Sequence, residues 1–249
     1  MKIHVGIPAR MAASRFPGKP LAKILGRTMI DHVVSRTKLA KNVDNLFVAT
    51  CDNEIVDEVK KLGIQSILTD KNILRPGLRV ASALNQFLTE DDDIVIVVQG
   101  DEPLVHPSMI ETAIKELKAQ KTFQVGTLYG KSSEEEFNDP NEVKVVLGNN
   151  NQILYMSRSP IPFQMVNQKN NRFKQVAIIP FRMSYLKKFE KITPRFAELT
   201  EAIELLRVIE NGDKLLGIYT DKKNVSVDTI EGLAEAEIAM KYDELYGSY

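Results

Sequence analysis

The sequence predicts an α/β protein in which helices cover a largely parallel sheet, and two patterns predict it. Across the first half of the 249 residues, short β-branched runs alternate with amphipathic stretches. The run from Asp93 to Val98 is apolar at every position after the first, as expected of a central strand buried on both faces. Because the chain shows no repeat, low-complexity segment or linker, we expect residues 1–249 to form one domain.

Each element of the first half follows from its local pattern. The β-branched runs predict strands at Ile3–Ile7, Asn45–Thr50, Gln65–Leu68, Ile94–Gln99 and Gln124–Tyr129. The stretches between and after them predict helices at Met29–Ala40, Glu54–Leu62, Val80–Leu88, Pro107–Ala119 and Ser133–Phe137. This alternation is typical of parallel strands, which need a crossover connection between them.

The second half has a different pattern, which predicts a β-hairpin or arm element around residues 142–181. Asn149-Asn150-Asn151 indicates the turn of a hairpin, and Asn211-Gly212 is a good helix end. In order, we predict hairpin strands at Glu142–Leu147 and Gln152–Met156, a loop or arm at Gln164–Lys174, a strand at Gln175–Phe181, a helix at Glu198–Glu210, strands at Lys214–Tyr219 and Val225–Val227, and a helix at Ile230–Tyr246.

Composition excludes several classes of protein. The 33 Lys and Arg residues balance 33 Asp and Glu residues, so no overall field attracts the chain to nucleic acid or to an anionic membrane. No apolar run is long enough to span a bilayer, and the chain starts without the apolar segment of a signal peptide, so we expect a cytoplasmic protein. Cys51 is the only cysteine, which excludes an internal disulfide and a cysteine metal cluster.

A basic loop follows the first predicted strand. Arg10, Arg15 and Lys19 lie among small residues outside the carboxyl end of that strand, where ligands bind in open α/β sheets. Cations neutralise several anionic oxygens at once, so the loop predicts a polyphosphate site; the alternative is a solvated surface loop. The loop has neither the Walker spacing nor a Gly-x-Gly-x-x-Gly fingerprint, which disfavours kinase-type and hydride-transfer enzymes.

Two carboxylates are predicted at the same edge of the sheet. Asp101 follows the buried strand, after Gly100, which would permit close approach of a ligand. Asp228 follows the predicted strand Val225–Val227 in the same way. Two carboxylates facing a polyphosphate suit Mg²⁺, which takes one or two protein carboxylates together with phosphate oxygens. The structural alternatives are a turn residue for Asp101 and a helix N-cap for Asp228.

Several segments together carry a resemblance to a known family. They are Ile7–Arg10, Ser14–Leu21, Val98–Pro103, Asn138–Val146, Tyr155–Pro162, Leu206–Gly212 and Val227–Thr229. In this combination the chain resembles the CMP-Kdo synthetases, the 3-deoxy-manno-octulosonate cytidylyltransferases, over nearly its whole length. The resemblance implies a Rossmann-like mixed sheet of the nucleotide-diphospho-sugar transferase type, a homodimer, and a role in lipopolysaccharide biosynthesis.

The resemblance also implies an activity. The anomeric hydroxyl of an acidic sugar would attack the α-phosphorus of CTP, giving a CMP-sugar and pyrophosphate. At the matching positions, Arg10, Ser14, Arg15 and Lys19 would hold the triphosphate, Ala9, Gln99 and Gly100 would lie against the nucleotide and sugar, and Asp101 and Asp228 would hold Mg²⁺. Arg10, Lys19 and Asp101 would be the catalytic residues, and Asp101 could also help to deprotonate the attacking hydroxyl.

Three segments depart from the family pattern, in regions that face the sugar or the base in the family. Asn72–Arg79 replaces His-x-Ser-Gly-Thr-acid-Arg, Gln175–Ile179 replaces a segment with the pattern His-x-Gly-Ile-Tyr, and Leu205 replaces the Gln of Glu-Gln-Leu-Arg. Because a site that hydrogen-bonds substrate hydroxyls discriminates strongly, these losses can change specificity. Kdo, an amino-substituted Kdo and another 2-keto-3-deoxy acid sugar therefore remain as candidate substrates.

The remaining polar candidates lie in or near these segments. Arg75, Arg79, Arg158, Glu204 and Arg207 are candidate substrate contacts. Arg158 and Arg207 would bind the sugar carboxylate, or else form structural ion pairs. Two other functions stay open: a nucleotidyltransferase of the same fold with another nucleotide or with another acceptor, such as a different acid sugar or a sugar phosphate, and a catalytically silent nucleotide-binding homologue. The presence of both the basic loop and the two carboxylates speaks against the silent homologue.

Overall fold

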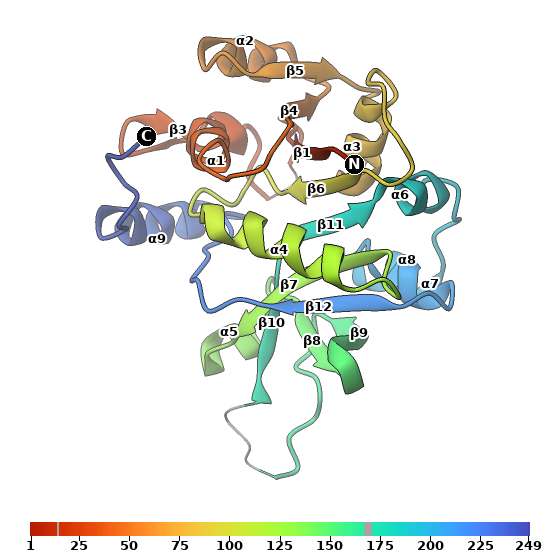
Figure 1. The fold of residues 1–249 in the computed structure, drawn as a ribbon. Coiled ribbons are helices and arrows are strands. Elements are labelled where there is room, and N and C mark those ends of the chain that lie inside the picture. Colours follow the sequence, from red (N-terminus) through yellow and green to blue (C-terminus); the bar gives the residue numbers. More distant parts are fainter. Residues whose placement is uncertain (14, 167–170) are drawn as a thin grey trace.

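A ten-stranded mixed sheet with helices on both faces forms the body of the protein (Figure 1). The computed structural model describes residues 1–13, 15–166 and 171–249. The strands of the large sheet, in chain order, are β1 (Ile3–Pro8), β4 (Asn45–Thr50), β5 (Gln65–Leu68), β6 (Ile94–Val98), β7 (Val125–Lys131), β8 (Lys144–Leu147), β9 (Gln152–Ser157), β10 (Phe173–Val176), β11 (Ile178–Arg182) and β12 (Leu215–Tyr219). The short strands β2 (Lys23–Ile24) and β3 (Arg27–Thr28) pair separately.

The helices connect and flank these strands. In chain order they are α1 (Met29–Thr37), α2 (Asn53–Lys61), α3 (Pro76–Leu84), α4 (Pro107–Ala119), α5 (Glu134–Asn138), α6 (Met183–Phe189), α7 (Phe196–Glu201), α8 (Leu206–Glu210) and α9 (Ile230–Lys241). Two 3₁₀ turns, η1 (Lys19–Leu21) and η2 (Asn149–Asn151), complete the described elements. None of these helices is both long and apolar enough to cross a membrane.

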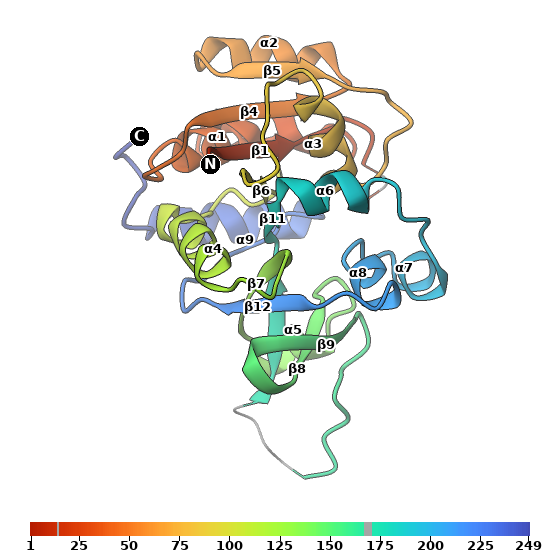
Figure 2. The same ribbon diagram turned by 45° about the vertical axis from the view of Figure 1, so that its right-hand side comes forward.

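The sheet order confirms the mixed α/β fold class. Its strands run in the order β10-β8-β9-β12-β7-β11-β6-β1-β4-β5. The edge formed by β6, β1, β4 and β5 is entirely parallel, as the alternating first half predicts. β11 inserts antiparallel between β6 and β7, and β12 pairs parallel with β7. The predicted hairpin is present as the antiparallel pair β8 and β9, which lies below β12 in Figure 2.

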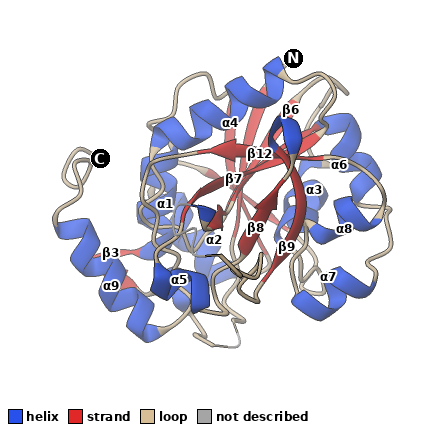
Figure 3. Cartoon of the chain, turned by 90° about the horizontal axis from the view of Figure 1, so that it is seen from below, coloured by secondary structure: helices blue, strands red, loops and turns tan. Residues whose placement is uncertain are grey.

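The central strand β6 explains why both faces of the sheet are covered. Ile94, Ile96 and Val98 pack into a core with α1, α2 and α4, whereas Val95 and Val97 face a second core with α3 and α6. All five side chains are fully buried. Since successive side chains of a strand point to opposite faces, an all-apolar run needs helices on both sides. Figure 3 shows the strands enclosed between helices in this way.

Two predicted helices differ from the structure. The helix expected at Val80–Leu88 is α3, which begins four residues earlier because Pro76 occupies its first turn, where a proline needs no hydrogen-bonded N–H. The helix expected at Glu198–Glu210 is broken into α7 and α8, since Ala202 has a left-handed φ of 55°. The break exposes main-chain carbonyls that arginines from other elements use.

Further differences concern short or extended segments. The strand predicted at Gln175–Phe181 is interrupted at Ala177, which separates β10 from β11. Residues 225–227 form no strand, because the only ladder-like bond there runs from Val227 N–H to Asp101 O at 2.9 Å. The final helix ends at Lys241 rather than Tyr246. α6, β2 and β3 were not among the predicted elements.

Candidate active site

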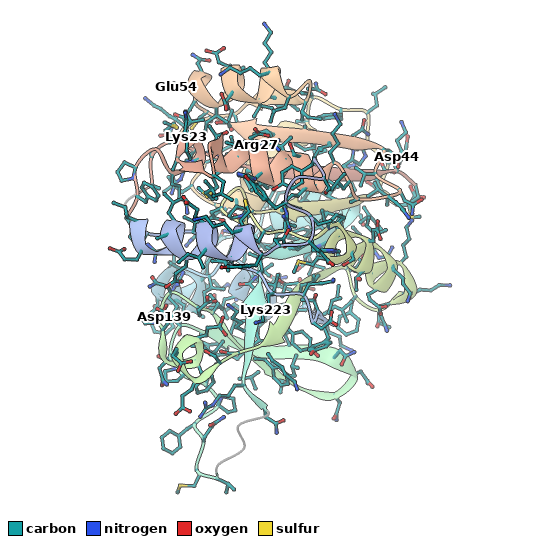
Figure 4. The ribbon with its side chains drawn as sticks, turned by 90° about the vertical axis from the view of Figure 1, so that its left-hand side faces the viewer. Lys23, Arg27, Asp44, Glu54, Asp139 and Lys223 are labelled. Atoms are coloured by element: carbon teal, nitrogen blue, oxygen red, sulfur yellow. The ribbon has the colours of Figure 1, made fainter. Side chains whose placement is uncertain are left out.

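Two adjoining cavities open at the carboxyl ends of β1 and β6. Their volumes are about 830 and 220 Å³. Both are lined by Arg10, Arg15, Pro76, Gln99, Asp101 and Asp228. The basic loop and the two carboxylates therefore meet at one place, as the sequence predicts for the edge of the sheet. Figure 4 views the side that α9 crosses, where Asp139, which lines the larger cavity, lies below that helix.

Most of the predicted site residues line these cavities. Arg75, Arg158 and Glu204 line the larger one, and Ala9, Lys19, Arg79 and Gly100 line the smaller one. Arg207 lines neither of them, but lies in a separate cavity of about 780 Å³ that also borders Arg10 and Arg75. Ser14 lies outside the described residues.

The geometry of the basic loop directs Lys19 toward the end of β6. The loop closes through a hydrogen bond from Gly18 N–H to Met11 O at 2.9 Å, and Met11 N–H binds Asp52 Oδ2 at 2.8 Å. Gly18 has a φ of 76°, a conformation that a residue with a side chain rarely adopts. η1 then begins at Lys19, so the lysine side chain starts from a fixed backbone position.

Lys19 joins the two predicted metal carboxylates. Its Nζ lies 2.6 Å from Asp101 Oδ2 and 2.9 Å from Asp228 Oδ1. Arg15 Nη2 lies 2.8 Å from the other oxygen of Asp228. Arg10, by contrast, makes no ion pair with any described residue while bordering all three cavities. The site thus combines a closed ion cluster with an arginine, Arg10, that has no ion-pair partner among the described residues.

The pKa shifts in this cluster follow from burial and charge. Burial acts to raise the pKa of Asp228, but the positive charges of Lys19 and Arg15 outweigh it, so the pKa falls below 3.8. Burial acts to lower the pKa of Lys19, yet Asp101 and Asp228 raise it above 10.5. At neutral pH the side chain of Lys19 is therefore an ammonium and that of Asp228 a carboxylate.

The donor set fits Mg²⁺ completed by a ligand. Among the described residues no group of three or more His, Cys, Asp or Glu side chains is placed to bind a metal. Asp101 and Asp228 instead converge on one cationic group, the Lys19 ammonium, and the Val227 carbonyl lies 3.1 Å from the same Nζ. Mg²⁺ commonly takes one or two carboxylates and fills its shell with water and phosphate oxygens. The residues present therefore suit a metal that binds together with a polyphosphate.

Packing within the chain also favours glycine at position 100. A Cβ atom there would lie 2.7 Å from Pro8 O and 3.3 Å from Ala9 Cβ, so the close approach is made by the chain's own β1 end. This close contact between Gly100 and the end of β1 brings Gln99 and Asp101 beside the start of the basic loop. Ala9 is 7 % exposed and lies at the wall of the smaller cavity.

Arg158 is anchored by main-chain carbonyls and retains unused donors. Its Nε donates to Glu201 O at 2.9 Å, and its Nη1 donates to Pro140 O at 3.0 Å and Asn141 O at 3.2 Å. The carbonyl of Glu201 is free for this bond because the predicted helix breaks there. A guanidinium has five N–H donors, and no described residue accepts a bond from the Nη2 group of Arg158, whose side chain lines the larger cavity.

Arg207 and Arg79 are buried in structural contacts. Arg207 forms a bidentate pair with Glu198, at 2.6 and 2.7 Å, and Arg75 Nε lies 3.1 Å from the same carboxylate. Glu198 is fully buried and Arg207 is 2 % exposed. Arg79 donates to Thr69 Oγ1 at 2.5 Å and to the Ile73 carbonyl. Of the two alternatives for Arg207, the structural ion pair matches its surroundings.

Glu204 caps α3, the helix that begins at Pro76 within the altered segment Asn72–Arg79. Its two carboxylate oxygens accept hydrogen bonds from Gly77 N–H at 2.9 Å and Leu78 N–H at 3.2 Å. Burial raises its pKa, and these N–H groups and the charge of Arg207 oppose the rise without cancelling it. Glu204 therefore helps to position α3 at the cavity wall.

Several residues at the cavity were not predicted as site residues. Lys174 Nζ lies 2.8 Å from Glu136 and 2.9 Å from Glu142, and all three side chains line the larger cavity. Glu102, also in the lining, hydrogen-bonds with Asn224; burial and then the charge of Asp101 raise its pKa well above 4.5. The sequence signal for Glu136 was an acidic helical turn, which usually indicates a solvated face.

Comparisons with known proteins identify a family for this chain. The cytidylyltransferase family matches residues 5–218. An 8-amino-3,8-dideoxy-manno-octulosonate cytidylyltransferase of Shewanella baltica is 36% identical over 98% of this chain and 100% of its own length. A 3-deoxy-manno-octulosonate cytidylyltransferase of Fusobacterium nucleatum is 39% identical over 94% of this chain and 95% of its own.

Solved structures give the same assignment. A CMP:2-keto-3-deoxy-manno-octonic acid synthetase complexed with CTP has a TM-score of 0.88, at 31% identity over 97% of this chain and 99% of that one. A 4-diphosphocytidyl-2C-methyl-D-erythritol synthase from Anaerococcus prevotii shares the fold at a TM-score of 0.67 and 12% identity. With the family match, the full-length relatives and the conserved architecture combined, this chain belongs to the cytidylyltransferase family.

Proposed function

We propose that this protein transfers the cytidylyl group of CTP to an acidic 2-keto-3-deoxy sugar and releases pyrophosphate. The observation that carries the proposal is the convergence of Lys19, Arg15, Asp101 and Asp228 at the end of β6. It is supported by relatives named as cytidylyltransferases for 3-deoxy-manno-octulosonate and its 8-amino analogue.

The proposed reaction is an in-line displacement at phosphorus. The anomeric oxygen of the sugar forms a bond to the α-phosphorus, and the bond from that phosphorus to the β-phosphate oxygen breaks. Such reactions depend on alignment and on neutralising charge. Arg10, Arg15 and Lys19 supply cations for the leaving pyrophosphate, and Asp101 is placed to accept the proton of the attacking hydroxyl.

We further propose Mg²⁺ as the cofactor, held by Asp101 and Asp228. When bound, it would stabilise negative charge on the phosphate oxygens. The side chains contribute independently of it: the loop closed by Gly18 fixes the cations, and Gln99 lines both cavities beside the expected nucleotide.

An acidic acceptor is supported by Arg158. Among the described residues nothing accepts a bond from its Nη2 group, and Arg158 lines a cavity that is otherwise rich in carboxylates. A hydrogen bond between a charged N–H donor and a carboxylate is strong, so this group suits the sugar's carboxylate. Gln175, at the second altered segment, lines the same cavity and donates to Thr127 Oγ1 at 3.0 Å.

The direct test is pyrophosphate release from CTP and Mg²⁺ with a panel of acidic sugars. The panel includes Kdo and its 8-amino analogue, with ATP, GTP and UTP in place of CTP as nucleotide controls. We expect release with CTP and at least one of these sugars. Release with a sugar phosphate alone would favour a different acceptor, and nucleotide binding without release from any sugar would favour a silent homologue.

Asp101→Asn provides the matched chemical test. We expect turnover to fall by about 100-fold or more, because the amide keeps the shape but removes the charge that faces the reacting phosphate. Circular dichroism and thermal unfolding should show an intact fold. Retained turnover would remove Asp101 from the mechanism.

We also propose a cytoplasmic homodimer. The proposed reaction consumes a nucleoside triphosphate, which favours a cytoplasmic location for the enzyme. The dimer is supported by a run of exposed apolar side chains along β9 and the segment after it: Leu154, Tyr155, Phe163, Met165 and Val166.

A further inference from the structure

The two carboxylates proposed to hold the metal are already occupied by the protein's own cations. Lys19 Nζ lies 2.6 Å from Asp101 Oδ2 and 2.9 Å from Asp228 Oδ1, and Arg15 Nη2 lies 2.8 Å from Asp228 Oδ2. Both oxygens of Asp228 are therefore engaged. A divalent ion that binds between the two aspartates therefore competes with these cations for the same oxygens.

Lys19 is held in this position by all of its donors. An ammonium group has three N–H bonds, and its third partner here is Val227 O at 3.1 Å. The lysine side chain is only 13% exposed. The oxygens of Asp101, Asp228 and Val227 thus form a nearly enclosed cation site whose occupant in the ligand-free protein is Lys19.

The same oxygens cannot serve both cations. Mg²⁺ binds oxygen at about 2.1 Å, so an ion bound to both carboxylates would use lone pairs that now point at Nζ and would repel the ammonium. In addition, Lys19 and Arg15 together balance the two negative charges of the aspartates. The ligand-free cluster therefore offers a divalent ion little net attraction.

A triphosphate changes this balance. It carries several anionic oxygens into the cavity, and Arg10, which borders the cavity without an ion pair among the described residues, is available to bind them first. Phosphate oxygens compete with the aspartates for Lys19 and Arg15. Once those cations turn to the phosphate, the aspartate oxygens become free.

We propose that Lys19 occupies the metal position in the free protein, so that the divalent ion binds well only after a nucleoside triphosphate has drawn Lys19 and Arg15 away. This inference rests on the proposed function, since it takes a triphosphate as the ligand. Nucleotide and metal then bind with positive coupling, and by linkage each strengthens the other equally. The alternative is that Lys19 is a permanent structural tie between the two aspartates.

Metal binding to the nucleotide-free protein separates these two possibilities. The probe is Mn²⁺, measured by the loss of the free-ion signal in electron paramagnetic resonance, without nucleotide or sugar. We expect weak binding to the wild type and about tenfold or tighter binding to Lys19→Met, which removes the ammonium but keeps an unbranched side chain. Lys19→Arg, which keeps the charge, should show no comparable gain.

Lys23→Met is the matched control for the loss of a lysine charge. Lys23 is exposed on β2, and Figure 4 shows it on the side of the molecule above α9. Its substitution should leave Mn²⁺ binding unchanged. Anomalous scattering from crystals of Lys19→Met soaked in Mn²⁺ should place the ion against Asp101 and Asp228.

The inference would be overturned by a folded Lys19→Met that binds Mn²⁺ no more tightly than the wild type. If Lys19→Met does not fold, Arg15→Gln makes the same prediction with a smaller gain, because it frees Asp228 Oδ2 alone; no gain there overturns the inference as well. The proposed function fails separately, through absence of pyrophosphate release by the wild type, whatever the metal affinities are.

Discussion

Two arginines that look equivalent in the sequence have different surroundings and should respond differently to substitution. Arg158 keeps donors at the cavity, so Arg158→Lys should raise the KM for the sugar by about tenfold, since it removes the guanidinium N–H groups that would bind the carboxylate. Arg207→Ala should instead lower the free energy of unfolding by about 3 kcal/mol, because it leaves buried Glu198 with only Arg75 as a partner.

Steady-state kinetics and urea unfolding of both variants check this pair. Unfolding of Arg158→Lys should change less than that of Arg207→Ala, because the bonds from Arg158 Nη1 to Pro140 O and Asn141 O are exposed and water can replace them. The assignment would be reversed if Arg158→Lys lost mainly stability and a folded Arg207→Ala lost mainly sugar affinity.

Gly100 makes a second prediction at the level of a single residue. A methyl group there would lie 2.7 Å from Pro8 O, and a backbone carbonyl cannot move aside cheaply. Gly100→Ala should therefore cost about 1–3 kcal/mol of stability and displace Asp101, with lower turnover. Gly232→Ala in α9 is the control, because its nearest neighbours are at 3.6 Å or more and it should unfold like the wild type. Equal stability of the two variants would contradict this explanation.

The chemistry of the site was more predictable than its contacts. Arg10, Lys19 and Asp101 could be named from sequence because they follow β1 and β6 at the same edge of the sheet. Asp228 was named after a predicted strand at Val225–Val227, which the structure does not form, although the residue does reach this edge. No sequence pattern indicated that Lys19 would bind both aspartates, or that Arg207 would be buried against Glu198. Those pairings join residues far apart in the chain, and only the tertiary structure decides them.

Among the elements, α1 and the C-terminal segment form a pH-sensitive contact. His32 is fully buried, with Nε2 2.9 Å from Ile24 O and Nδ1 2.8 Å from Tyr249 Oη. A carbonyl only accepts, so Nε2 carries the proton and Nδ1 accepts from the tyrosine, as in a neutral ring. Burial lowers the pKa of His32 below 6.5, and the Ile24 carbonyl only partly opposes it.

The sign of the resulting pH dependence is fixed by this shift. As the pH falls below 6.5, the unfolded chain takes up the His32 proton before the folded protein does, so stability is lost as the pH falls toward the folded pKa. One such proton contributes at most about 1.4 kcal/mol per pH unit. The free energy of unfolding of His32→Gln should therefore fall less than that of the wild type between pH 7.5 and 5.5. Parallel urea-unfolding results for the two proteins would exclude His32 as the source.

The predicted elements succeeded where the local pattern alone decides the structure. α4 has the predicted bounds, Pro107–Ala119, because its proline start and its amphipathic pattern agree. The break between α7 and α8 was missed, since nothing in the local sequence requires Ala202 to be left-handed. That break frees the carbonyls of Glu201 and Ala202, which accept bonds from Arg158 and Arg75.

For the whole molecule, the order of the strands explains why the site lies where it does. β1 and β6 are parallel neighbours, so their carboxyl ends deliver the basic loop and Asp101 side by side. The segment before α9 then returns to this edge, where Val227 N–H binds Asp101 O at 2.9 Å and places Asp228 opposite. The antiparallel insertion of β11 next to β6 was not predictable, because strand order depends on contacts distant in sequence.

The proposed homodimer is a prediction about the whole molecule. Phe163, Met165 and Val166 are 85%, 87% and 69% exposed, in the segment that follows β9. Exposing several large apolar side chains within four residues is unfavourable in free energy, and such a cluster is typical of an interaction surface. Light scattering at micromolar concentration should therefore give twice the 28.0 kDa mass of one chain.

Charges placed in this segment should separate the two copies. We expect the double variant Phe163→Asp and Met165→Asp to be monomeric, because a dimer would have to bury its carboxylates without partners. Phe196→Asp, at an 81% exposed position on α7, is the control and should stay dimeric. A dimeric double variant would place the interface elsewhere, and a monomeric wild type would contradict the dimer itself. Neither Phe163 nor Met165 lines the two active-site cavities. Any loss of turnover in the monomer would therefore show that dimer formation supports the active site.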